Sequence, residues 1–311
     1  MPAARASAGG VKGSAMLGGS GAASGFRAEG SSVGAVLRRS RILIGEQPLG
    51  VVGLVLVLLV VVTAVFARQL SSYAPEALSG PPLAEPSGVH WFGTDDLGRD
   101  VLSRVIHGGR ISLTVGAISV LLGCAAGTTL GLLSGYLGGR VDLVIQRFVD
   151  GLMAFPTLVL ALAIVATFGT TQRNVIMAIS VAMVPLITRV IRGSVLLVGG
   201  EPFVEAARGL GARPPRIMLR HVLPNLVGPI VVVATAFFGT AIVTEAALSF
   251  VGLGTPPPTP SWGNMMAGSA RTYITSAPWM ALFPGLALSV LVFGVNVLGD
   301  AVRDLMDPRL R

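Results

Sequence analysis

The 311-residue sequence is poor in charged residues, cysteine and lysine, and each shortage excludes a class of protein. Only 12% of the residues are charged and 52% are hydrophobic, and the mean hydropathy of +0.76 excludes an ordinary soluble domain. The single cysteine, Cys124, stands in an apolar run, so the sequence encodes neither a disulfide framework nor a cysteine-rich zinc site. The composition therefore indicates an integral membrane protein.

Motifs for nucleotide hydrolysis and for catalysis are also missing. The sole lysine, Lys12, is not part of a GxxxxGK[ST] turn, in which a lysine would reach the phosphates of a nucleotide. HExxH and GxSxG patterns are absent, and the three histidines, His90, His107 and His221, are far apart in the chain. We therefore expect no catalytic residues, no metal site and no cofactor bound by this chain.

The formal net charge of +8 raises the question of a nucleic-acid partner. The arginines are dispersed between apolar runs, however, and do not form one basic stripe. Such a distribution is typical of topology signals that face an anionic membrane surface. We expect membrane lipid around the chain and no nucleic acid.

Six charge-free runs predict about six transmembrane helices. A helix needs about 20 residues to cross a hydrocarbon core of ~30 Å. The runs are 49–67, 111–139, 151–172, 174–188, 222–244 and 272–299. The fourth is short unless Arg189 and Arg192 extend toward the interface. The sequence thus predicts an all-α polytopic membrane protein.

Basic residues set the predicted orientation. If both termini are cytoplasmic, 17 of the 23 basic residues lie inside. Residues 1–48, rich in glycine, alanine and serine, then form a disordered cytoplasmic tail with a basic flank, and 49–67 form the first span. Residues 68–110 form an extracytoplasmic loop, 111–299 a five-helix core with a cytoplasmic loop at 189–225, and 300–311 a cytoplasmic tail.

The extracytoplasmic loop contains one predicted amphipathic helix. Thr94 or Asp95 can cap a helix on which Leu97, Val101 and Val105 share a face. A calcium loop that began at Asp95 would need a glutamate at its twelfth position, where Ile106 stands. A capped helix on the membrane surface is therefore the favoured interpretation of this acidic cluster.

A basic polar island separates two apolar runs at residues 201–224. Pro202 suits a first helical turn, and Gly209 and Gly211 end the helix that follows. The small or apolar residues of that helix recur with helical spacing, at Phe203, Ala206, Ala207 and Leu210. A short helix of this kind between two spans is suited to docking against a protein rather than to burial in lipid.

The same island resembles the EAA loop of the permease subunits of ABC importers. The matching residues are Glu205, Ala206, Ala207, Gly211, Leu223 and Pro224, with His221 where many members have isoleucine. The alternative is an ordinary amphipathic loop helix, which leaves the full spacing unexplained. Residues 92–113 are similar to the FGTDxxGRDxxSRxxxGxRxSL pattern of the C-type (OppC/DppC-like) permease subunits of dipeptide, oligopeptide and nickel importers.

This resemblance implies a type I importer core with one extra N-terminal span in a bacterial inner membrane. It also implies half of a pore for short peptides, with partners in a sister permease, an extracytoplasmic binding protein and ATPase subunits that bind ATP and magnesium. The EAA residues would couple the permease to the ATPases. Nickel, haem or oligosaccharide cargo remains an alternative, as does a stand-alone secondary transporter, for which paired midplane acids are missing.

Two polar residues in the predicted spans are candidates for the translocation pathway. Glu245 is the one acid deep in a long apolar run, and Asn296 lies in the last run. For each we keep two interpretations open. Glu245 is either a structural, hydrogen-bonded acid or a pathway residue, and Asn296 is either a helix–helix hydrogen-bonding residue or a substrate ligand.

Overall fold

The computed structural model describes residues 48–306. The chain divides into the units 1–41 and 42–311, and all described residues lie in the second unit. Residues 1–47 of the tail predicted at 1–48 and the chain end at 307–311 lie outside the described residues, and Pro48 begins a helix.

Helices make up nearly all of the regular structure. They are α2 (Pro48–Val65), α3 (Ala67–Leu70), α4 (Val101–Leu137), α5 (Gly139–Met153), α6 (Thr157–Phe168), α7 (Gln172–Gly199), α8 (Pro202–Gly209), α9 (Pro214–Ile217), a π-helix (Met218–Val222), a 3₁₀ helix (Leu223–Leu226), α10 (Val227–Phe250), α11 (Trp262–Met266), α12 (Ser269–Thr272) and α13 (Trp279–Met306). Within residues 48–306 there is no β-strand, only two isolated bridges. The predicted all-α class is confirmed.

The number of spans also agrees with the prediction. Five helical segments are long and apolar enough to cross a membrane, and the bent pair α5–α6 raises the number to six if it is one span. The two helices of that pair meet at 86°. The chain is therefore a multi-pass membrane protein.

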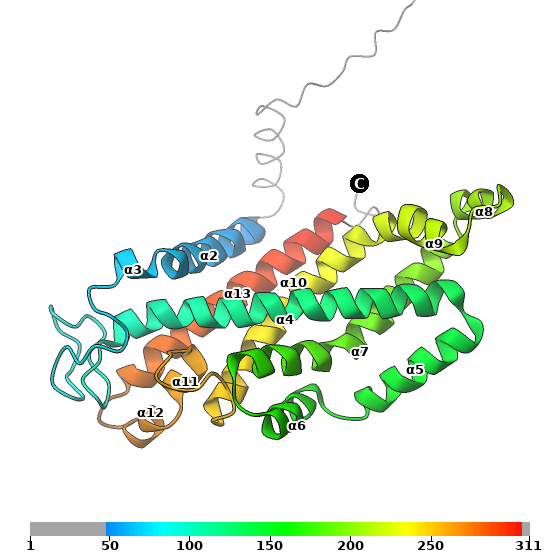
Figure 1. Ribbon diagram of the computed structural model, residues 1–311. Helices are drawn as coiled ribbons and strands as arrows, with labels where there is room; N and C mark the ends of the chain where they lie inside the picture. Colours follow the sequence, from blue (N-terminus) through cyan, green and yellow to red (C-terminus); the bar gives the residue numbers. More distant parts are fainter. Residues whose placement is uncertain (1–47, 307–311) are drawn as a thin grey trace, which may run out of the picture. The chain divides into compact units, whose positions relative to one another are not determined.

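The helix α4 is the longest element and runs the length of the bundle (Figure 1). It packs along α7, and small residues permit this approach. A Cβ atom on Gly127 would lie 2.6 Å from Cγ2 of Ile187, and one on Gly131 would lie 2.8 Å from the carbonyl oxygen of Thr188. The loop at 71–100 meets the start of α4, whereas α8 and α9 lie near its end (Figure 1).

The helix predicted to begin at Thr94 or Asp95 starts later in the structure, so that prediction is wrong. Residues 94–100 form turns, Leu97 is exposed, and the helix begins at Val101. Asp100 caps it, because its carboxylate accepts a hydrogen bond of 2.8 Å from the backbone N–H of Ser103. The helix then continues into the span without a break, ten residues before the predicted run at 111.

The third predicted run, 151–172, is not one straight helix. The chain breaks at 154–156, where Pro156 offers no N–H and restricts Phe155 before it. The preceding helix α5 carries charged residues, so most of it lies outside the charge-free runs. The fourth run, predicted to stop at 188, continues as α7 to Gly199.

The last two spans are also displaced from their predicted bounds. The fifth and sixth runs were predicted to end before an acidic residue, because a charge ended each run. The helix α10 instead continues past Glu245 to Phe250, and α13 continues past Asp300 to Met306. The helix α13 begins at Trp279, seven residues later than the run predicted. The predicted tail at 300–311 is thus helical over its described part.

Candidate functional site

The EAA segment folds as the short helix α8, which Pro202 opens as predicted. Val204 and Ala207 are buried against the bundle core. The other side of α8 is exposed: Phe203 keeps 43% of its surface accessible, Leu210 just beyond the helix keeps 89%, and Glu205 and Ala206 are exposed between them. Of the predicted apolar face, Ala207 alone is buried among the described residues 48–306, and Phe203, Ala206 and Leu210 are exposed.

Gly211 ends the α8 turn in a left-handed conformation, with φ of +76°. No atom lies within 4 Å of the place where its Cβ would stand, so backbone conformation rather than crowding requires the glycine. Its N–H donates to the carbonyl oxygen of Arg208 at 2.9 Å. This turn directs the chain from α8 into α9.

The second half of the motif joins α9 to α10. His221 lies in the π-helix, and its carbonyl oxygen accepts a hydrogen bond of 2.7 Å from Nδ2 of Asn225. Leu223 and Pro224 begin the 3₁₀ helix, Leu223 packed against the core and Pro224 exposed. The helical path from Pro214 to Phe250 is nearly continuous, so no flexible linker separates α9 from α10.

One contact joins α8 to the end of α4. The guanidinium of Arg208 lies over the ring of Tyr136, 5.3 Å from its centroid. The sequence contains no indication of this pair. Residues 72 positions apart give no periodic signal that would connect them.

A polar cluster beside this contact joins α4, α5 and α7. The Nε and Nη2 atoms of Arg192 each donate to a different carboxylate oxygen of Asp142, both at 2.6 Å. The hydroxyl of Ser134 donates to the same carboxylate and accepts from Nε2 of Gln146 at 2.9 Å. A more exposed pair joins the same two helices, α5 and α7, where Arg189 lies 2.7 Å from Asp150. The two arginines expected to extend toward the interface are therefore paired with acids on α5.

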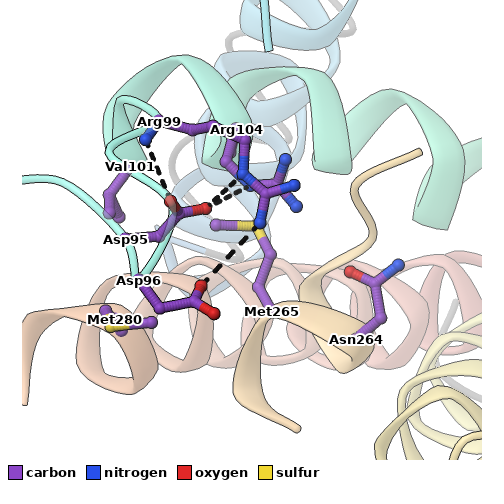
Figure 2. Close-up of a pocket in the computed structure, with 8 residues that line it drawn as sticks. All are labelled: Asp95, Asp96, Arg99, Val101, Arg104, Asn264, Met265 and Met280. Atoms are coloured by element: carbon purple, nitrogen blue, oxygen red, sulfur yellow. Dashed lines mark hydrogen bonds and ion pairs between the residues drawn. The ribbon is translucent and has the colours of Figure 1, made fainter. Parts of the chain in front are cut away.

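The opposite end of α4 holds a charged cluster on the loop (Figure 2). Asp95 lies 2.6 Å from Nε of Arg99 and 3.5 Å from Nε of Arg104, and its second oxygen accepts from two backbone N–H groups. Asp96 lies 3.9 Å from Nη2 of Arg99. The cavity that these side chains line with Met265 and Met280 has a volume of only about 50 Å³. Its size and its compensated charges indicate a fixed attachment of the loop to α4.

Two tryptophans fix this loop end further. Nε1 of Trp279, at the start of α13, donates to the carbonyl oxygen of Thr94 at 3.0 Å. Nε1 of Trp262, in α11, donates to that of Val105 at 2.8 Å. Within residues 48–306, no group of three or more histidine, cysteine or acidic residues could hold a metal ion.

The two pathway candidates occupy different surroundings. Glu245 is fully buried, and its carboxylate oxygens accept hydrogen bonds from the hydroxyls of Ser112 at 3.0 Å and Ser249 at 2.7 Å. Asn296 is exposed on α13, and its Oδ1 would lie 2.7 Å from a Cβ on Gly239 of α10. The fold does not bring the two together. A pathway role for either stays a prediction.

Comparison with known proteins agrees with this architecture. The family described as "Binding-protein-dependent transport system inner membrane component" matches residues 127–311. The dipeptide transport system permease protein DppC of Alkalihalophilus pseudofirmus is 44% identical over 86% of this chain and 88% of its own length. The glutathione transport system permease protein GsiD of Pectobacterium atrosepticum is 43% identical over 86% of this chain and 89% of its own.

A solved structure shares the fold of the core. It is a chain of the MetNI methionine ABC transporter, described as inward facing, with a TM-score of 0.55 and 18% identity over 66% of this chain and 96% of that one. The family match covers more than half of the sequence, and it includes α8, the Gly211 turn and α10. This chain therefore belongs to the family of binding-protein-dependent transport system inner membrane components.

Proposed function

We propose that this chain is a permease subunit of an ATP-driven importer and forms half of a translocation pathway for short peptides. Its partners would be a sister permease, ATPase subunits that bind ATP and magnesium, and an extracytoplasmic binding protein that delivers the cargo. Family membership supports the transport role. The dipeptide and glutathione permeases among its relatives support peptide cargo.

The uncovered face of α8 is the observation that carries this proposal. Phe203 in α8 and Leu210 just beyond it expose large apolar surfaces, whereas Val204 and Ala207 fix the helix to the bundle. A surface of this kind is suited to a hydrophobic groove on another protein. The ATPase subunit is the proposed occupant, and both chain termini would then lie on its side of the membrane.

The contacts of α8 suggest how motion would reach the pathway. An ATPase that moved α8 would displace the Arg208–Tyr136 contact at the end of α4 and the helical path that leads into α10. Both helices span the bundle, so a rigid displacement at one end would re-orient them at the other. Alternating access of the pathway would follow from this re-orientation.

Site-specific crosslinking tests the docking surface directly. In a Cys124→Ala background, a cysteine in place of Phe203 should crosslink to the ATPase subunit in the assembled transporter. A cysteine in place of the exposed Val89, in the loop at the other end of α4, is the matched control and should not. A crosslink from Val89, or none from Phe203, would contradict the proposed docking.

A further inference from the structure

A groove between α2, α4 and α10 opens beside an arginine whose charge is not neutralised by any residue of the described segment 48–306. Its walls are Val61, Ala64 and Val65 from α2, Leu113 and Ala117 from α4, and Phe238 from α10. The cavity volume of about 390 Å³ falls within the roughly 300–1,000 Å³ of ligand clefts. The polar residues of its lining are Arg110 and Thr114.

The guanidinium of Arg110 is available to a ligand. Within the described part of the chain, it takes part in no hydrogen bond, ion pair or ring contact, and the residue is exposed. The Thr114 hydroxyl donates to the backbone carbonyl oxygen of Arg110 at 2.7 Å, so its proton is already used. A permanent positive charge at the edge of an apolar groove attracts an anionic group that is attached to an apolar chain.

Arg110 also lies at the level where the apolar spans end. The helix α2 stops at Val65, Arg68 follows in α3, and the charge-free part of α4 starts directly after Arg110. An arginine at such a boundary places its charge among lipid headgroups and its methylene groups among acyl chains. The outward surface of α2 beside the groove is apolar, with Val55, Leu59 and Val62 exposed, which is suited to lipid.

We propose that this groove binds a phospholipid, with the phosphate paired to Arg110 and one acyl chain along the walls formed by α2, α4 and α10. The planar guanidinium matches a phosphate with two parallel hydrogen bonds, and basic pockets between transmembrane helices bind lipid headgroups in this way. A second cavity on the other side of α2, of about 490 Å³, has no ionisable residue in its lining. The groove beside Arg110 therefore offers a positive charge, which the binding of an acyl chain alone does not require.

Native mass spectrometry of the full chain, purified with the subunits that accompany it, measures lipid retention. The probe is dioleoyl-phosphatidylglycerol added to the delipidated protein. Arg110→Gln should lower the retained fraction at least fivefold, and Arg110→Lys should retain an intermediate amount because it keeps the charge but loses the planar fork. Arg68→Gln is the matched control, since it removes an exposed positive charge outside the groove lining and should leave retention within twofold of the parent.

Filling the groove tests the acyl chain separately from the phosphate. Ala117→Phe should lower retention, whereas Ala125→Phe, at an exposed position of α4 outside the groove, should not. Unchanged retention in Arg110→Gln would overturn the site. Loss of retained lipid in Arg110→Gln without loss in Ala117→Phe would overturn the placement of the acyl chain in the groove.

A photo-crosslinking amino acid at position 117 distinguishes the lipid from a protein in the same groove. A lipid-sized mass added to this chain supports the proposal. A crosslink to the sister permease in place of the lipid would overturn it.

Discussion

Arg208 and Tyr136 connect the short helix α8 with α4, the longest helix of the bundle. The guanidinium lies 5.3 Å from the ring centroid, and the two residues belong to α8 and α4. The helix α4 extends from this contact to the Asp95–Arg104 ion pair at its other end. The helix α4 therefore joins α8 at one end to the loop at 71–100 at the other.

The first prediction concerns this contact. Tyr136→Leu removes the ring face and should lower ATP-driven uptake by about twofold to tenfold, because a cation–π contact contributes about 0.5–1 kcal/mol at exposed sites and more when desolvated. Tyr136→Phe keeps the ring and should stay near the parent. ATPase activity and uptake are measured together in proteoliposomes. Equal uptake by the leucine and phenylalanine variants would show that the contact has no part in coupling.

The second prediction compares the two ion pairs between α5 and α7. The Asp142–Arg192 pair is bidentate and about two-thirds or more buried, whereas the Asp150–Arg189 pair is about half exposed. Asp142→Asn should lower the free energy of unfolding by about 1–2 kcal/mol, because hydrogen bonds to charged groups exceed neutral ones. Asp150→Asn should cost less than about 0.5 kcal/mol. Thermal unfolding in detergent measures both.

A variant with the two charges exchanged is the control for the Asp142–Arg192 pair. Asp142→Arg combined with Arg192→Asp should recover part of the stability that either single change loses, as expected for directly coupled residues. Losses that simply add would show that the two side chains act independently.

The third prediction concerns Glu245. Both of its carboxylate oxygens are occupied by serine hydroxyls, and the residue is fully buried. We therefore expect Glu245→Gln to leave the ratio of uptake of a lysine-containing peptide to that of an alanine-only peptide unchanged. Glu245→Ala leaves the hydroxyls of Ser112 and Ser249 without this partner and should reduce assembly. A changed ratio in the glutamine variant would establish the pathway role instead.

The elements that the sequence predicted well are those set by local chemistry. Pro202 opens α8 and Gly211 closes its turn, because a missing N–H and a positive φ are properties of single residues. The apolar runs located most of the spans, because the cost of a charge in hydrocarbon is also local. These features need no knowledge of which helices are neighbours.

The features that the sequence did not reveal depend on contacts between distant residues. The helix α5 was missed because Asp142 and Asp150 interrupt the apolar run, yet both are paired with arginines on α7. The loop at 94–100 is a different case, because Asp95 pairs with the nearby Arg99 and Arg104 and Asp100 caps the helix in its place.

The fourth prediction concerns orientation. In a Cys124→Ala background, cysteines at Ser87 and Thr259 should react with an impermeant thiol reagent from outside intact cells. Cysteines at Ala212 and Leu310 should react only after the membrane is opened. Labelling of Ala212 in intact cells would place α8 on the wrong side for an ATPase.

The central claim is that α8 couples this chain to an ATPase. The most direct measurement is ATP-dependent peptide uptake in proteoliposomes by Leu210→Asp and Glu205→Lys, with the amount of bound ATPase subunit determined for each. Both side chains are exposed, so neither change should disturb the fold of the chain. The account predicts that uptake falls at least tenfold and that ATPase association weakens in parallel. Full ATP-dependent uptake by both variants would contradict it.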